Sequence, residues 1–191
     1  MRKFLVAVFF LVLGLGPVTS HAIPIVTAGS ATVNVGDTFT IPISITDAVN
    51  LTSFQFDLDF DASILQVTAT GVTESPFFTQ GDATVFVPGF VDNTNGQILG
   101  VSDALILQAP VNGSGDLAFV EFMAIAAGIS PLTLSNVFLN LSNSGFDVTN
   151  GEVCVNSPTA PTCPVQAPEP GTVALLAMGL AAVTWRRRRT R

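Results

Sequence analysis

Hydrophobic and polar residues alternate along residues 33–60 with a period of two. In the segment TFTIPISIT (38–46) every second residue is Phe or Ile, and in FQFDLDF (54–60) every second residue is Phe or Leu. This period predicts β-strands that have one face in a core and the other in water. Similar apolar runs occupy residues 83–91, 96–104, 115–127, 131–141 and 151–155.

Local signals within and between these runs predict turns and irregularities. Asn95-Gly96 favours a hairpin turn, because both residues tolerate a positive φ. Pro42 interrupts a strand pattern, which indicates an edge strand or a bulge. Asp61 opens the segment DASIL (61–65), where its side chain can accept a backbone hydrogen bond as the N-cap of a helical turn.

The spacing of these runs defines the fold class. About seven to nine short strands in roughly 130 residues, without a long helix, predict an all-β fold, specifically an antiparallel β-sandwich. Most of the phenylalanines lie in this part of the chain and are expected to fill its core. A chain of this size buries enough surface for one core, so we expect a single domain.

The N-terminus has the layout of a secretory signal peptide. Arg2 and Lys3 precede an apolar stretch, residues 4–15, and Ser20-His21-Ala22 supplies a small-x-small pattern. We therefore expect residues 1–22 to be removed and the rest of the chain to be exported. An uncleaved N-terminal anchor is the alternative.

The C-terminus combines an apolar run, residues 171–185, with a cluster of arginines in residues 186–191. As a helix this run is about 22 Å long, whereas a bilayer core is about 30 Å thick, so it is short for a permanent span. A proline-rich stretch, residues 156–167, precedes it and favours an extended, semi-rigid linker.

Charge is distributed unevenly. All 14 acidic residues lie between Phe4 and Trp185, and that interval contains no Lys or Arg. The exported body therefore cannot form Lys or Arg ion pairs, and its carboxylates can only repel, be solvated or bind cations. Nucleic acid is excluded as a partner, because nothing here neutralises phosphate.

The residue composition also argues against an enzyme. The single histidine, His21, lies in the signal peptide, so no Ser-His or Cys-His pair can form. Two carboxylates could still act as acid and base. However, Asp37-Thr38-Phe39 lacks the glycine of an Asp-Thr-Gly protease motif, and the body has no Trp or Tyr to form a sugar platform.

Calcium is an alternative role for the acidic residues. Asp57 and Asp59 occupy successive outward positions on one strand, about 6.6–7 Å apart, and could approach one ion. The nearby loop DNTNGQ (92–97) places its glycine one residue too early for an EF-hand. We therefore assign no metal site and no cofactor, and ordinary solubilising carboxylates are the default interpretation.

The two cysteines, Cys154 and Cys163, lie at the end of the expected sandwich and in the proline-rich stretch that follows. Export favours a disulfide between them, which would contribute roughly 2.5–3 kcal/mol on the chain-entropy model. Two ligands do not make a zinc site.

Residues 33–70, 92–104 and 113–137 carry a Val-Gly-Asp opening, a Phe-x-Phe-x-Leu-x-Phe-Asp strand and a Gly-x-Leu-x-x-Val-x-Phe strand. In content, order and spacing, these three segments together resemble cohesin domains. The resemblance implies a jelly-roll sandwich over residues 23–155 that binds the calcium loops of dockerin modules through one sheet face.

The strand from Thr52 to Phe60 would lie on that recognition sheet. Its outward residues Gln55, Asp57 and Asp59 are then candidate partner contacts. The alternative is a solvated polar face, which any half-buried strand needs.

The C-terminal segment, residues 168–191, resembles the PEP-CTERM sorting signal, with Pro168, Glu169 and Pro170 as its motif. The resemblance implies transient insertion in the inner membrane, with the arginines on the cytoplasmic side. It also implies cleavage near the motif by an exosortase and delivery to the cell surface or extracellular matrix. A plain C-terminal anchor is the alternative.

These observations predict a non-enzymatic, exported binding or scaffolding protein that engages a protein partner, with a dockerin-type module as the candidate. A polysaccharide-binding module of the biofilm matrix is the alternative function, with exposed Phe77, Phe78 or Phe90 as its stacking residues.

Overall fold

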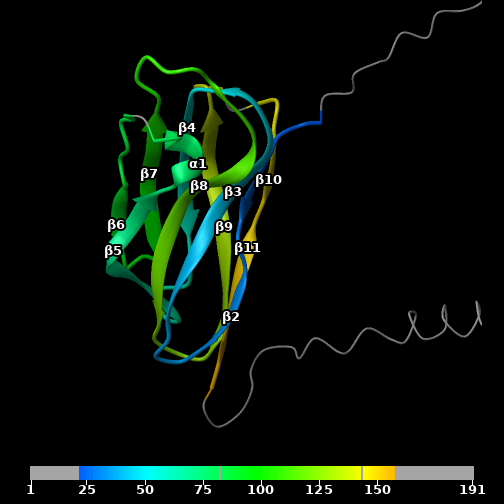
Figure 1. Cartoon of the computed structure of the whole chain (residues 1–191). Helices are drawn as coiled ribbons and strands as arrows, with labels where there is room; N and C mark the ends of the chain where they lie inside the picture. The colour runs from blue at the N-terminus through cyan, green and yellow to red at the C-terminus, as the bar shows by residue number, and fades with distance from the viewer. Residues whose placement is uncertain (1–21, 82, 143, 158–191) are drawn as a thin grey trace, which may run out of the picture.

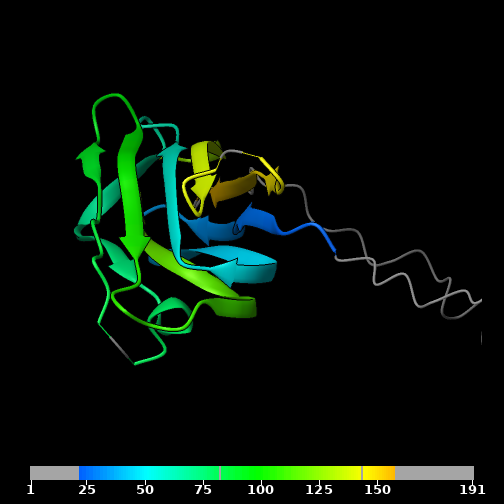
Figure 2. The same ribbon diagram turned by 90° about the horizontal axis from the view of Figure 1, so that it is seen from above.

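The computed structural model describes residues 22–81, 83–142 and 144–157, which form two packed β-sheets (Figures 1 and 2). The predictions of a signal peptide in residues 1–22 and of a C-terminal hydrophobic helix fall, apart from residue 22, outside these residues. Within the described ranges, no helix is long and apolar enough to cross a membrane.

The two sheets are built from eleven described strands. The five-stranded sheet has the order β10 (Asp147–Thr149), β1 (Ile25–Ala28), β3 (Thr38–Leu51), β8 (Val111–Ala124) and β5 (Leu65–Glu74). The six-stranded sheet has the order β2 (Ala31–Asn34), β11 (Gly151–Asn156), β9 (Gly128–Leu139), β4 (Ser53–Asp59), β7 (Gln97–Ala104) and β6 (Phe90–Asp92). All pairs are antiparallel except β1–β10 and β2–β11, so the predicted β-sandwich is confirmed, with parallel pairing near one side of each sheet.

The alternation seen in the sequence matches the inner faces of β3 and β4. Ile41, Ile43 and Ile45 are buried on β3, and Phe54 and Phe56 are buried on β4. These side chains meet those of the opposite sheet in one continuous core. Burial of this apolar surface, at about 25 cal/mol per Å², is the main force that holds the sheets together.

Pro42 lies on an interior strand, because β3 pairs with both β1 and β8. The expectation of an edge strand is therefore wrong, whereas a register shift does follow, between Ile43 and Ser44. β1 ends at Ala28, and the next residue, Gly29, donates its N–H to the Pro42 carbonyl at 2.9 Å. A Cβ on Gly29 would lie 2.9 Å from Pro42 Cδ, so glycine is needed beside the proline ring.

The turn predictions hold with one refinement. Residues 61–65 form a turn in which the Ser63 N–H donates to Asp61 Oδ1 at 2.9 Å. The β6–β7 hairpin closes with Asp92 opposite Gln97, so its loop has more residues than Asn95-Gly96 alone. Gly96 has φ 71°, and its carbonyl accepts the Phe60 N–H at 2.8 Å.

Several segments depart from the strand prediction, among them residues 83–91 and β5. Residues 83–91 were expected as a strand but make isolated bridges at Thr84 and Val87, because Pro88 and Gly89, which has φ 79°, break the ladder before β6. In contrast, β5 forms where no strand was expected. A four-residue helix, α1 (Pro76–Thr79), follows β5 and is capped by the Ser75 side chain.

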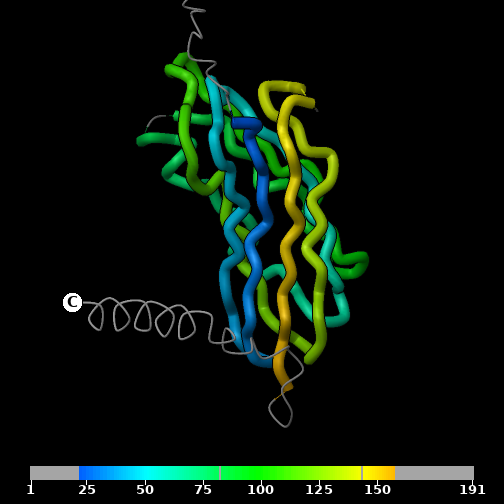
Figure 3. The backbone as a smooth tube through the Cα atoms, turned by 90° about the vertical axis from the view of Figure 1, so that its right-hand side faces the viewer, coloured from blue at the N-terminus to red at the C-terminus, as the bar shows by residue number. Residues whose placement is uncertain are grey.

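The directions of the strands place the start of β1 and the end of β11 at opposite ends of the sandwich. The Val35 N–H donates to the Asn156 carbonyl at 3.2 Å, so β11 ends beside the β2–β3 turn. The starts of β1 and β4 and the ends of β7 and β9 lie at the other end (Figure 3). The segment that leads toward the predicted linker therefore leaves from the end opposite to Ser53 and Ala104.

Candidate functional site

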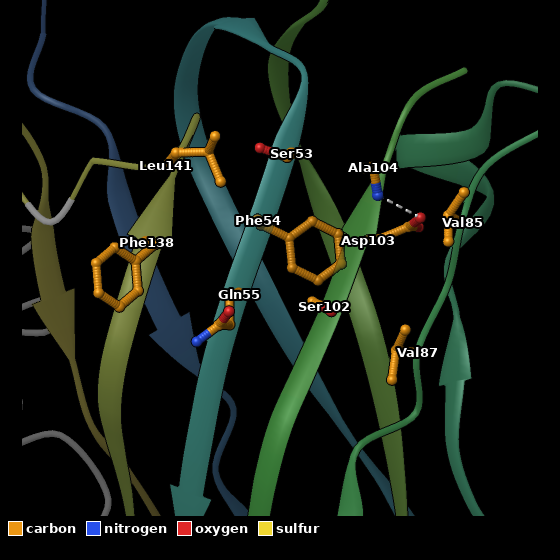
Figure 4. A pocket seen from close by; sticks show the side chains of 10 residues that line it. All are labelled: Ser53, Phe54, Gln55, Val85, Val87, Ser102, Asp103, Ala104, Phe138 and Leu141. Carbon is orange, nitrogen blue, oxygen red and sulfur yellow. Dashed lines mark hydrogen bonds between the residues drawn. The ribbon is translucent and has the colours of Figure 1, made fainter.

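A groove of about 460 Å³ crosses the outer face of the six-stranded sheet (Figure 4). It lies at the end where β4 begins and where β7 and β9 end. Its floor is formed by side chains from these three adjacent strands: Ser53 and Gln55 from β4, Ser102 from β7 and Phe138 from β9. Because successive strand residues point to opposite faces of the sheet, these side chains point outward, and their neighbours along each strand point into the core.

Apolar side chains form the two edges of the groove. On one edge lies Leu141, which follows β9, has φ 63° and is 90% exposed. On the other edge lie Val85 and Val87, which are also exposed. A large apolar side chain held in solvent on left-handed backbone costs free energy, so this edge is a candidate for contact with another molecule.

The edge that carries the valines, residues 83–89, is called here the groove wall. The Val85 N–H donates to the Ala104 carbonyl at 2.9 Å, and the Val87 N–H donates to the Ser102 carbonyl at 2.8 Å. The Ser102 N–H donates back to Val87 at 3.0 Å. These bonds hold the groove wall against β7.

Among the described residues, the outward surface of the groove is neutral. Its polar side chains are two serines and a glutamine, which can donate and accept hydrogen bonds without charge. Such a surface suits an apolar segment of a partner that also brings a few polar groups.

One acid, Asp103, lies beneath the groove and is 1% exposed. Its Oδ1 accepts the Ala104 N–H at 2.8 Å. Burial raises the pKa of Asp103 to about 7, and a hydrogen bond with Glu74 and the negative charge of that residue act in the same direction.

Asp57, predicted as an outward contact, is buried, so its expected exposure is wrong. Its Oδ1 accepts the Gly100 N–H and its Oδ2 accepts the Asn136 side-chain amide, both at 2.6 Å. Register shifts occur at this point against both β7 and β9. Gly100, with φ 72°, and Asn136, with φ 47°, turn their donors toward the carboxylate, which therefore stabilises two bulges.

Gln55 and Asp59 lie on β4 as expected, but they are not together in one site. Gln55 lines the groove. Asp59 is half-buried toward the other end of the strand and accepts the Gln97 side-chain amide at 2.9 Å.

Comparison with known proteins assigns the family. Residues 25–155 match the model of the cohesin domain. The chain belongs to the cohesin family. Residues 166–189 match the PEP-CTERM protein-sorting motif, which indicates export and cell-surface sorting. A search of curated proteins gives no match.

Solved cohesins share the fold. A non-cellulosomal cohesin from the hyperthermophilic archaeon Archaeoglobus fulgidus is 22% identical with a TM-score of 0.56, over 70% of this chain and 91% of that one. CaCohA2 from Clostridium acetobutylicum is 21% identical with a TM-score of 0.55, over 71% and 92%. A type I cohesin–dockerin complex from Clostridium thermocellum, Coh-OlpC-Doc435, gives 14% and 0.56, over 71% and 94%. The cohesin fold is a non-catalytic protein-binding module.

The described acids of the cohesin domain do not gather as metal ligands. In the described ranges, no group of three or more His, Cys, Asp or Glu side chains could hold a metal ion. Both oxygens of Asp57 already accept N–H donors. Asp92 accepts the backbone N–H groups of Thr94 and Asn95 at 2.9 and 3.0 Å, which closes its own loop and lowers its pKa.

The aromatic residues considered for glycan stacking differ in their burial. Phe78 is fully buried, 5.0 Å from Phe54 between ring centroids. Phe77 is half-buried and packs against Gly115, where a Cβ would lie 2.3 Å from its ring. Phe90 is exposed, as the glycan alternative required, but it does not line the groove.

Most of the groove residues of the cohesin domain were missed by sequence reasoning. Val85, Val87, Ser102 and Leu141 come from separate segments, and pairing of β7 with β4 and with the groove wall brings them together. The available signal was Leu141, an apolar residue in the Asn140–Ser144 stretch of small polar residues.

Two further predictions reach beyond the described residues. The described part of the chain has no free cysteine, and Cys163, the expected partner of Cys154, lies outside it. The disulfide therefore stays a prediction. Pro168, Glu169 and Pro170 also lie outside the described residues.

Proposed function

We propose that this chain is an exported, surface-sorted binding protein whose cohesin domain captures a protein partner in the groove described above. The observation that carries the proposal is the groove itself, because it combines exposed apolar edges with a neutral hydrogen-bonding floor on three adjacent strands. Rigid strands hold such contacts in fixed positions, which lowers the entropy lost on binding.

A dockerin-type module is the partner that we propose. Solved relatives in this fold include cohesin–dockerin complexes, such as Coh-OlpC-Doc435. The groove lies on the face that carries β4, the strand on which we predict partner contacts. Gln55 is the predicted contact that lines it.

Charge substitutions on the groove edge test the binding site. Val87→Asp and Leu141→Asp change exposed side chains, so the fold should persist while an apolar contact becomes a desolvated carboxylate. Binding to a dockerin module in a pull-down should weaken at least about tenfold, which corresponds to about 1.4 kcal/mol. Val35→Asp is the matched control, since Val35 is 39% exposed, against 45% for Val87, and lies at the opposite end of the sandwich.

The same assay separates the two functions. Retention on a polysaccharide affinity gel, unaffected by Val87→Asp, would contradict the groove proposal and favour glycan binding. Equal loss of dockerin binding in Val35→Asp and Val87→Asp would also contradict it, because the effect would not be local.

We also propose that an exosortase cleaves the chain near Pro168-Glu169-Pro170 and so delivers the cohesin domain to the cell surface or its matrix. The sorting motif at residues 166–189 supports this step. Mass spectrometry of the surface fraction should find chains that end near residue 170, and replacement of the three motif residues by alanine should abolish this product. Intact Arg191 in the surface fraction would contradict the proposal.

A further inference from the structure

We propose that Glu74 and Asp103 share one proton beneath the groove, and that loss of this proton loosens the groove wall, so that the groove responds to pH. The inference deepens the proposed function: its link to partner binding rests on the groove being the binding site, whereas the shared proton and the response of the wall do not.

The two carboxyl groups join three segments of the domain. Glu74 ends β5 in the five-stranded sheet, and Asp103 lies near the end of β7 in the six-stranded sheet. Thr84, in the groove wall, donates its hydroxyl to Glu74 Oε1 and also interacts with Asp103. The cluster therefore connects both sheets and the groove wall at one corner of the sandwich.

One oxygen in this cluster has no donor. Asp103 Oδ1 accepts the Ala104 N–H, but Oδ2 is buried without a hydrogen-bond partner among the described residues. The neighbouring Glu74 carboxylate is also an acceptor. Two acceptors can satisfy each other only when one of them carries a proton, so an Asp103 O–H that donates to Glu74 removes the deficit.

No positive charge in the described chain relieves the pair, because residues 22–157 contain no Lys, Arg or His. The elements packed around Asp103 contribute Phe54 from β4, Thr84 and Val85 from the groove wall, and Glu74 from β5. Among these described neighbours, Glu74 is the one titratable group. Burial, together with Glu74, raises the pKa of Asp103 to about 7, within the range that an exported protein meets.

The groove wall is the part that ionisation would move. When both acids are ionised, two like charges face each other, one on the buried Asp103 and one on the half-buried Glu74, and favour separation. β5 and β7 are each held in a sheet, whereas the groove wall is attached to β7 by its backbone bonds and to Glu74 through Thr84. Separation therefore acts on the attachment of Val85 and Val87, which form one groove edge.

Hydrogen exchange of the Val85 and Val87 amides tests this response in the purified full chain in detergent. After correction for intrinsic rates, their protection should fall about tenfold or more between about pH 5.5 and about pH 8. Glu74→Gln should abolish the fall, because its amide donates to the Asp103 carboxylate and removes one charge. Asp103→Asn should do the same, and it serves as a second variant should Glu74→Gln fold poorly.

Glu121→Gln is the matched control. Glu121 also accepts a threonine hydroxyl, from Thr68, without a second acid in that hydrogen bond, so this variant should respond to pH like the parent chain. An unchanged protection of the parent chain across this range, or a response that persists in both variants, would overturn the proposal. A change in protection on addition of EDTA at constant pH would overturn it too, because a metal ion would then occupy the pair.

No partner is needed for this experiment. If the groove were not the binding site, the exchange response would remain while Val87→Asp left binding intact. If the proton were not shared, the response would be absent while Val87→Asp still weakened binding.

Discussion

Asp57 and Asp103 are buried acids on neighbouring strands of the same sheet, and their surroundings differ. Asp57 receives two N–H donors, one from each adjacent strand, at 2.6 Å. Asp103 receives one, and its other oxygen lies without a donor beside another acid. In a domain without cations, the backbone and neighbouring side chains must supply the donors that a buried carboxylate needs. Asp57 is thus suited to a structural role and Asp103 to a response.

Neutral hydrogen-bond donors also take the place of cations beside acids on the surface of the sandwich. Asp116 accepts the Ser44 hydroxyl and Asp61 accepts the Ser63 hydroxyl, each at 2.6 Å. The hydrogen bonds with Ser63 lower the pKa of Asp61. Hydroxyl and amide groups therefore donate most of the hydrogen bonds to carboxylates that lysine and arginine donate in other proteins.

The largest effect is expected from Asp57→Ala. This change leaves the Gly100 N–H and the Asn136 amide without their acceptor, and hydrogen bonds to a charged group contribute about 1.5–3 kcal/mol each. The free energy of unfolding should fall by about 3–6 kcal/mol in urea titrations. Asp59→Asn is the control, because Asp59 is half-buried with one amide partner, and it should cost less than about 1 kcal/mol. Equal losses for the two variants would contradict the distinction.

Asp103→Asn should change the pH dependence of stability more than its level. The pKa of Asp103 is raised from 3.8 to about 7, so the folded chain binds this proton more tightly than the unfolded chain. The resulting stability is complete below about pH 4 and is lost as the pH rises to about 7, by up to about 4 kcal/mol. Unfolding of the variant should therefore lack this loss. Parallel pH profiles for the variant and the parent chain would contradict the assignment.

Reduction of the predicted Cys154–Cys163 bridge should lower the free energy of unfolding equally at every pH, because neither Asp57 nor Asp103 takes part in the bridge. A loss of about 2.5–3 kcal/mol is expected from the chain-entropy model. Urea titrations with and without reductant, at two pH values, measure it. Two thiols that react with a labelling reagent in the non-reduced exported protein would show that the bridge is absent.

Gly100→Ala should have the smallest effect. Gly100 has φ 72°, and a Cβ there would meet no atom within 4 Å, so the cost is conformational alone. About 1 kcal/mol of destabilisation is expected. A loss as large as that of Asp57→Ala would mean that the bulge itself, rather than its hydrogen bonds to Asp57, supports the sheet.

The parts of the fold that were predictable from sequence rest on local patterns. Alternation of Phe and Ile identified β3, and Phe and Leu identified β4, because a half-buried strand must alternate. The turn at Asp61 followed from its capping side chain. β5 was not predicted because Ala69-Thr70-Gly71 interrupts its apolar pattern where the register shifts against β8.

The candidate site was harder to predict because it depends on register. Asp57 alternates correctly for an outward residue, and only the bulges at Gly100 and Asn136 enclose it. Asp103 acquires its raised pKa from burial and from Glu74, which lies on the other sheet. Gln55 was predicted on the recognition strand, whereas the groove edges come from chain segments whose pairing no local pattern specifies.

β11 ends beside the β2–β3 turn, at the far end of the sandwich from Ser53 and Leu141. A chain attached through residues beyond Asn156 would consequently hold the groove outward, away from whatever carries it. Each residue of an extended proline-rich spacer adds about 3.1 Å of reach. Capture of a large partner would then be compatible with attachment to the cell, even before any processing of the C-terminal segment.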